Sequence, residues 1–314
     1  MTQTPADPSQ NFYSTKNFLL VFFISAVYLI FSFFLIGFKS EQIFLVALFA
    51  LMYFASKGTR KFIIAFSIFI IYWIVFDYMK AFPNYRYNYV HIGDLYFSEK
   101  KIFGISYEGN KITPNEYWLR HGNNFLDVLA GVFYLTWVPV PLMFASYLFF
   151  KKRRQFFYFS LTFFLVNIIG FIIYYAFPAA PPWYVQQHGF AFHAATPGST
   201  AGLSKFDHFF HINIFKSIYA KSSNVFAAMP SLHSSYPVIV LYYGLKNKLG
   251  AINILFAAIM CGIWFSAVYA SHHYVLDVLM GIACAITGIS FFQLLATKSR
   301  LMKLFVDKLV ATTS

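Results

Sequence analysis

Residues 18 to 38, Phe18-LLVFFISAVYLIFSFFLIG-Phe38, form a 21-residue stretch without a charged side chain. A helix needs about 20 apolar residues to cross the hydrocarbon core of a bilayer, so this stretch is long enough to span a membrane. It is too long for the apolar core of a signal peptide, and no small-residue cleavage site follows it. The sequence therefore predicts a retained transmembrane helix close to the N-terminus.

Seven further apolar segments follow this first one. They cover residues 42–56, 62–79, 125–150, 156–177, 226–245, 251–270 and 275–296. Hydrophobic residues make up 59% of the chain and charged residues 11%, and the mean hydropathy is +0.59. These values exclude an ordinary soluble domain. We expect an all-α fold, a polytopic membrane bundle of about eight spans.

Basic residues gather on one side of the predicted spans. They follow the second, fourth, sixth and eighth apolar segments, at Lys57, Arg60, Lys61, Lys151, Lys152, Arg153, Arg154, Lys246, Lys248, Lys298, Arg300, Lys303 and Lys308. Cytoplasmic loops are enriched in Lys and Arg, so this side is predicted to be cytoplasmic, with both termini on it. The net charge of +13 then reflects membrane orientation, and we expect no nucleic-acid partner.

The predicted organisation has four parts. A cytoplasmic tail (1–17) precedes N-terminal membrane helices (18–80), a catalytic membrane domain (81–296) and a basic cytoplasmic tail (297–314). Two long connections, residues 80–124 and 178–225, lie on the outer, non-cytoplasmic face. Loops of this length in a compact bundle are commonly functional.

Three residues at the outer helix ends form a candidate catalytic group. His273 and Asp277 are spaced i, i+4, which places them on one helix face, where the carboxylate can accept a hydrogen bond from the imidazole. His233 follows Pro230 and Ser231 at the start of another span, where helix amides favour an anion. A nucleophilic histidine held by a carboxylate, together with an acid–base histidine, is suited to phosphoryl transfer between lipids.

Other interpretations of these residues stay open. Asp277 could make only an interhelical polar bond that holds the bundle together. Asp207-His-x-x-His211 has the ligand types of a metal site, but we expect solvated or structural loop residues there. No metal and no cofactor are expected.

Two sequence motifs resemble the type 2 phosphatidic acid phosphatase superfamily. They are Pro230-Ser-Leu-His233 and Ser266-x6-His273-x3-Asp277, which match the second and third motifs of that superfamily. The Lys-x6-Arg-Pro pattern of its first motif has no clear match, and Ala267 stands where the superfamily usually has Arg. Those basic residues grip a phosphate monoester, so their loss argues against ordinary lipid phosphatase activity.

The inositol phosphorylceramide synthase branch of that superfamily is a closer match. The resemblance runs from about residue 94 to 294, through residues 126–129, 177–184 (FPAAPPWY), 197–205 (PGSTAGLSK), 226–234 (FAAMPSLHS) and 268–277 (VYASHHYVLD). It implies a six-helix superfamily core and a transferase that moves inositol phosphate from phosphatidylinositol to ceramide, releasing diacylglycerol.

The residues suggest a division of roles for such a reaction. His273 attacks the phosphorus and forms a phosphohistidine, Asp277 holds the imidazole, and His233 protonates the leaving oxygen. A phosphodiester carries one negative charge, so a single lysine with helix amides could hold it. The candidates for substrate binding are Ser231, Lys205, Tyr184, Asp127, Asn124 and His272.

Three rival functions remain at this stage. Water as acceptor would make a lipid phosphatase, and phosphatidylethanolamine as donor would make a ceramide phosphoethanolamine synthase. A non-catalytic lipid transporter would use the histidines only for packing. The predicted location is a bacterial inner membrane with the site facing the periplasm, or a Golgi membrane with the site facing the lumen.

Overall fold

The computed structural model describes residues 13–194, 196–220 and 224–314. The chain divides into two compact units, Met1–Ala81 with Phe305–Ser314, and Phe82–Leu304. Most of the predicted N-terminal tail, residues 1–12, lies outside the described residues. The unit boundary near the C-terminus falls within α15 (Arg300–Thr313).

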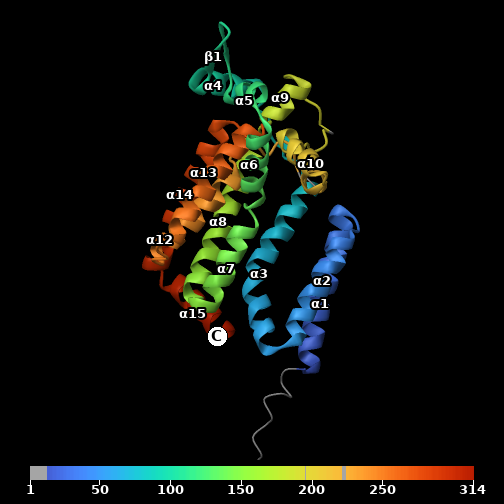
Figure 1. Ribbon diagram of the computed structural model, residues 1–314. Helices are drawn as coiled ribbons and strands as arrows, with labels where there is room; N and C mark the ends of the chain where they lie inside the picture. Colours follow the sequence, from blue (N-terminus) through green and yellow to red (C-terminus); the bar gives the residue numbers. More distant parts are fainter. Residues whose placement is uncertain (1–12, 195, 221–223) are drawn as a thin grey trace, which may run out of the picture. The chain divides into compact units, whose positions relative to one another are not determined.

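The first unit is built from three apolar helices. They are α1 (Thr15–Ile36), α2 (Ser40–Ala55) and α3 (Lys57–Tyr78), followed by the short η1 (Met79–Ala81) (Figure 1). Phe22 and Phe34 of α1 are 72% and 79% exposed, as expected for side chains that face lipid. A hydrogen bond of 2.9 Å between Ser32 and Tyr78 joins α1 to the end of α3.

The second unit contains the remaining long helices. They are α6 (Asn124–Leu135), α7 (Pro139–Lys151), α8 (Arg153–Ala176), α12 (Leu232–Lys246), α13 (Ile252–Tyr269) and α14 (Val275–Lys298). α6 and α7 form one apolar segment that is interrupted just before Pro139, because proline cannot continue the helical hydrogen bonding. α12 packs against α7, α8, α13 and α14 and so lies at the centre of the bundle.

The membrane prediction is confirmed. Within the described residues, six helices or helix pairs are long and apolar enough to cross a bilayer, and α2 is a shorter apolar helix of 16 residues. The predicted segment 226–245 becomes helical only at Leu232, because Ser231 serves as the N-cap, and α12 has 15 residues. The chain is thus an all-α, multi-pass membrane protein, and a crossing of the bilayer by the shorter helices α2 and α12 stays a prediction.

The two long connections of the second unit are structured. The first carries η2 (Asn84–Arg86), α4 (Gly93–Phe103), the antiparallel strands β1 (Ile105–Tyr107) and β2 (Asn110–Ile112), and α5 (Pro114–His121). The second carries α9 (Pro182–His188), η3 (Ala201–Leu203), α10 (Ser204–Phe210) and α11 (Ile214–Tyr219). Ala179, at the start of the second connection, forms β-bridges with His91 of the first connection and with Ala227, which directly follows the second. We call these two connections the outer loops.

Candidate active site

The starts of α12 and α14 meet at the centre of the site. The amide of Ser231, which caps α12, donates to the carbonyl of Asp277 on α14 over 2.9 Å. A glycine on α14 permits this approach, since a Cβ on Gly281 would lie 2.1 Å from the Ser231 carbonyl oxygen. Ser235 also donates to the carbonyl of Gly281 at 2.6 Å. The two short motifs predicted from the sequence are therefore brought together by close backbone packing.

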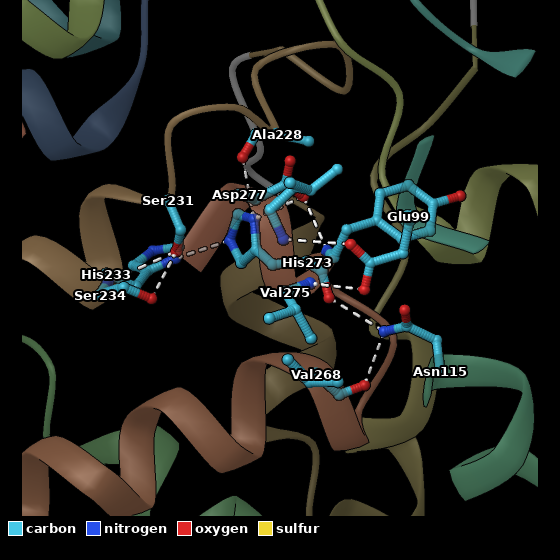
Figure 2. Close-up of polar contacts among 12 residues, drawn as sticks. Glu99, Asn115, Ala228, Ser231, His233, Ser234, Val268, His273, Val275 and Asp277 are labelled. Carbon is cyan, nitrogen blue, oxygen red and sulfur yellow. Dashed lines mark hydrogen bonds and ion pairs between the residues drawn. The ribbon is translucent and has the colours of Figure 1, made fainter. Parts of the chain in front are cut away.

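The two predicted catalytic histidines face each other (Figure 2). His233 Nδ1 lies 3.5 Å from His273 Nε2. His273 Nδ1 lies 2.9 Å from the carbonyl oxygen of Ala228. A carbonyl can only accept, so Nδ1 of His273 carries the proton and Nε2 keeps its lone pair. Nε2 is the nitrogen nearest to His233, and it is the atom expected from the sequence to act as nucleophile.

Asp277 lies beside His273 but does not make the hydrogen bond that the sequence predicts. Its Oδ2 is 3.7 Å from His273 Nδ1, and it accepts a 2.7 Å hydrogen bond from the amide of Tyr274. The i, i+4 spacing does place both groups on one face, but the carbonyl oxygen of Ala228 is closer to His273 Nδ1 and takes the hydrogen bond. The backbone carbonyl therefore fixes the tautomer, and an effect of Asp277 on the imidazole stays a prediction.

Tyr134 is a contact of His233 that the sequence did not reveal. Its hydroxyl lies 3.0 Å from His233 Nδ1, and its side chain is 1% exposed. The indole of Trp137 packs edge-on against the His233 ring, with centroids 4.4 Å apart. A signal was present, because Tyr134 shares the buried face of α6 with Asp127 and Ala130. Asp127 on this face is among the predicted substrate-binding residues, whereas Tyr134 is not among the predicted site residues.

His272 connects the site to the second outer loop. Its Nε2 lies 3.0 Å from the carbonyl oxygen of Thr200, and its ring stacks on Tyr219 with centroids 4.5 Å apart. It is 5% exposed. The structure therefore places this predicted substrate-binding residue in contacts that anchor the loop next to the histidine pair.

Burial keeps the histidines before α14 neutral. Loss of solvent lowers the pKa of His273 to about 4, although the hydrogen bond to Ala228 opposes this change. Burial, together with neighbouring His273, lowers the pKa of His272 to about 3. Both values lie well below 7, so at neutral pH the Nε2 lone pair of His273 is available for attack without prior loss of a proton.

Lys205 and Asp127 form a second polar group. Lys205 Nζ lies 3.6 Å from Asp127 Oδ1, and Tyr269 donates to the same oxygen at 2.7 Å. The Lys205 side chain is 42% exposed, whereas that of Asp127 is 8% exposed. Asn124, the first residue of α6, is exposed beside this group. The ammonium group of Lys205 on α10 is thus surrounded by polar side chains from α6 and α13.

Tyr184 and Ser231 are engaged in local structure. The buried Tyr184 hydroxyl donates to the Ala191 carbonyl and accepts from the His193 amide, both at 2.8 Å. The fully buried Ser231 hydroxyl accepts a 3.0 Å hydrogen bond from the Ser234 hydroxyl. These contacts order the second outer loop and the start of α12. Direct contact of either hydroxyl with substrate stays a prediction.

Asp207 of the candidate metal cluster caps a helix. Its carboxylate accepts hydrogen bonds from the amides of Phe215 and Lys216 at 3.2 and 2.9 Å, at the start of α11. Over residues 13–194, 196–220 and 224–314, no set of three or more His, Cys, Asp or Glu side chains is placed to hold a metal ion. The cap accounts for this aspartate without a ligand.

Known proteins resemble this chain over much of its length. The sequence model of the PAP2 superfamily matches residues 111–291. The chain is 44% identical over 297 residues to the phosphoinositol dihydroceramide synthase of Bacteroides thetaiotaomicron, covering 94% of this chain and 97% of that protein.

More distant matches come from fungi. The chain is 29% identical over 252 residues to the inositol phosphorylceramide synthase catalytic subunit of Saccharomyces cerevisiae, covering 74% of this chain and 59% of that protein. It is 29% identical over 195 residues to the inositol phosphorylceramide synthase of Candida albicans, covering 58% of this chain and 41% of that protein. The chain thus spans about half the length of these fungal relatives. No solved structure matches it.

Proposed function

The chain belongs to the PAP2 superfamily, as its motifs predict, and from this we propose that it is a lipid phosphotransferase. It moves inositol phosphate from phosphatidylinositol to the primary hydroxyl of a ceramide and releases diacylglycerol. The observation that carries the proposal is the facing pair His233 and His273, in which a backbone carbonyl leaves the nucleophilic nitrogen unprotonated. The names of the bacterial and fungal relatives point to the same reaction class.

The first half-reaction cleaves the donor. Nε2 of His273 attacks the phosphorus of phosphatidylinositol, and the bond from phosphorus to the glycerol oxygen breaks. His233, which enters this step as the imidazolium, gives one proton to that oxygen and becomes neutral, and diacylglycerol leaves. The inositol phosphate is then bonded to His273, whose positive charge lies 3.7 Å from the Asp277 carboxylate.

The second half-reaction uses the same groups in reverse. His233, now neutral, takes the proton from the primary hydroxyl of ceramide as the oxygen attacks phosphorus. The bond between phosphorus and nitrogen breaks, and His273 returns to its neutral state. The product is inositol phosphorylceramide, and His233 again carries the proton needed for the next cycle.

The preference for a phosphodiester donor rests on two basic features of the superfamily that this chain lacks, the arginine at position 267 and the Lys-x6-Arg-Pro motif. Ala267 is fully buried in an apolar cluster with Leu203 and Val278, so no arginine side chain extends from this position to a phosphate. A phosphomonoester, with up to two negative charges, would lack its usual cations here. A phosphodiester with one charge is a better match, which favours the transferase over the phosphatase.

A lipid-product assay tests the proposal. Purified protein in bilayers is given labelled ceramide or dihydroceramide with phosphatidylinositol, then with phosphatidylethanolamine, with a strong chelator present throughout. We expect an inositol-bearing ceramide product, because the proposed nucleophile and acid are both histidines. Phosphate release from phosphatidic acid with no ceramide product would contradict the transferase and favour a phosphatase. A product made only from phosphatidylethanolamine would instead change the donor.

Orientation is part of the proposal. The Lys and Arg pattern supports cytoplasmic termini, with the histidine pair facing the periplasm of a bacterial inner membrane, or the lumen if the source is eukaryotic. A cysteine placed at Ser106 in the exposed hairpin of the first outer loop reports this directly. Labelling of intact cells by a membrane-impermeant maleimide is expected, and protection until the cells are lysed would reverse the orientation.

Tyr134 is expected to set the proton position on His233. If the Nδ1–H of His233 donates to this hydroxyl, Nε2 is the nitrogen that gives a proton from the imidazolium to the leaving oxygen and then accepts one as the neutral base. Tyr134→Phe removes this hydrogen bond and keeps the ring. Since one hydrogen bond to a catalytic base is worth about 1 to 2 kcal/mol, kcat should fall about tenfold. Steady-state kinetics with a full pH profile measures this, and an unchanged profile would remove Tyr134 from the mechanism.

Lys205 is expected to contribute to donor binding. Lys205→Ala removes the exposed cation beside Asp127, and loss of one charged hydrogen bond to the donor should raise KM for phosphatidylinositol about tenfold. Because this contact does not change during the reaction, kcat should hold. Lys216→Ala, an exposed lysine of the same outer loop, is the matched control. If KM and kcat of the Lys205 variant both equal those of the wild type, the role is wrong.

A further inference from the structure

A carboxylate from the first outer loop holds the start of α14. Glu99 of α4 is fully buried, its Oε1 accepts from the Val275 amide at 3.0 Å, and its Oε2 accepts from the Leu276 amide at 3.1 Å. The first amides of a helix have no partner within the helix, so an external acceptor satisfies them. Figure 2 shows Glu99 directed at this turn, opposite the histidine pair.

Asn115 holds the residues just before that turn. Its Nδ2 donates to the carbonyl of Val268 at 2.8 Å and to the carbonyl of His273 at 2.9 Å (Figure 2). The amide of His273 itself donates to the Ala267 carbonyl at 3.0 Å. The backbone of the nucleophilic histidine is therefore fixed at both its amide and its carbonyl. Asn115 lies on α5, at the far end of the same outer loop as Glu99.

These contacts continue without a break through the turn. The amide of Tyr274 bonds to Asp277, and the next two amides bond to Glu99. Apolar packing supports the arrangement, because Leu95 of α4 and Tyr274 share a buried cluster with Ala228, whose carbonyl orients the imidazole. The first outer loop thus touches both the backbone and the side-chain support of His273.

We propose that Glu99 and Asn115 are positioning residues for catalysis, which fix the Nε2 atom of His273 in line with the donor phosphorus. The proposal rests on the proposed function for its chemistry. Neither side chain has to contact substrate, since both act through the backbone from Val268 to Leu276. Glu99 also lies outside residues 111–291, the part that matches the superfamily. We call the contacts of Glu99 and Asn115 with the backbone of residues 268–276 the brace. Part of the brace therefore comes from a segment of the first outer loop that lies outside the superfamily match.

Burying the carboxylate of Glu99 beside that of Asp277 costs free energy, and this cost supports a positioning role for Glu99. Burial, with a smaller effect of neighbouring Asp277, raises the pKa of Glu99 to about 7, while the two amide hydrogen bonds oppose the rise. An isolated helix cap is provided more cheaply by Ser, Thr or Asn. A long side chain that spans from α4 to α14 connects two elements, which a local cap cannot do.

The test compares Glu99→Ala, Glu99→Gln and Asn115→Ala with a matched control, Glu108→Gln, at the exposed turn of the hairpin in the same outer loop. A displacement of about 1 Å at a reacting atom can cost about 100-fold, so Glu99→Ala should lower kcat about 100-fold with KM little changed. Glu99→Gln keeps one acceptor oxygen and should recover part of that loss. The control should match the wild type.

Amide hydrogen exchange of residues 268–276 gives a readout that does not depend on activity. We expect faster exchange there in Glu99→Ala and Asn115→Ala, and wild-type exchange in Glu108→Gln. Unchanged exchange in both alanine variants overturns the brace. If exchange rises but kcat equals that of a wild type that makes product, the positioning role is wrong and the transferase stands. If the wild type makes no ceramide product, the proposed function fails, and the exchange result alone decides the brace.

Discussion

Replacing His273 with alanine is expected to abolish formation of inositol phosphorylceramide. The variant loses the only atom that is placed to attack phosphorus in the proposed mechanism, so the reaction cannot proceed through two easier steps. Removal of a covalent nucleophile from a hydrolase typically costs about 10⁶ in kcat, and we expect a loss of at least about 10⁴ here. Labelled ceramide with phosphatidylinositol in bilayers measures it.

A partial reaction tests whether His273 carries the covalent intermediate. Without ceramide, the wild type should exchange labelled diacylglycerol into phosphatidylinositol, because the first half-reaction is reversible. His273→Ala should lose this exchange, and it should also lose the acid-labile protein label that the wild type gains from phosphatidylinositol labelled in its inositol phosphate. His208→Ala, at an exposed outer-loop histidine of the candidate metal cluster, is the control and should keep both activities. Normal lipid handling by His273→Ala would support the transporter interpretation.

Local periodicity made much of the fold, and the proximity of the candidate catalytic residues, predictable. Apolar runs of about 20 residues predict membrane spans whatever the tertiary structure, and i, i+4 spacing places His273 and Asp277 on one face of any helix. The segment that ends in His233 was predicted for the same reason, since Pro230 and Ser231 mark a helix start. The helix boundary itself, at Leu232, depends on capping geometry.

Contacts between distant parts of the chain could not be predicted. The group that orients His273 is the backbone carbonyl of Ala228, 45 residues earlier, and no side-chain pattern identifies a carbonyl. Glu99 and Val275 are separated by 176 residues. Glu99 looked like one charge in a polar loop, because burial of a loop residue follows from tertiary packing. Tyr134 was hidden for the opposite reason, as one aromatic among many in an apolar segment.

Replacing Asp277 with asparagine should lower kcat by about three orders of magnitude while the fold is retained. The carboxylate lies 3.7 Å from the imidazole nitrogen that shares the positive charge of the phosphohistidine. At an effective dielectric constant of about 20, unit charges at this distance attract by about 4 kcal/mol, which corresponds to roughly a thousandfold in rate. The neutral asparagine provides little of this attraction, so formation and breakdown of the intermediate should both slow.

The same substitution distinguishes charge from hydrogen bonding, because an asparagine side chain keeps one acceptor oxygen. Its side-chain oxygen can still accept from the Tyr274 amide, the 2.7 Å contact made by Asp277, so thermal stability in detergent should change little. Asp207→Asn, the same change at a buried aspartate that caps α11, is the matched control and should keep kcat. If Asp277→Asn turned over like the wild type, the carboxylate would be a structural cap, and the Ala228 carbonyl alone would prepare His273 for attack. A slow variant of normal stability would show that negative charge beside the imidazole, rather than the hydrogen bond predicted from the spacing, is what Asp277 contributes.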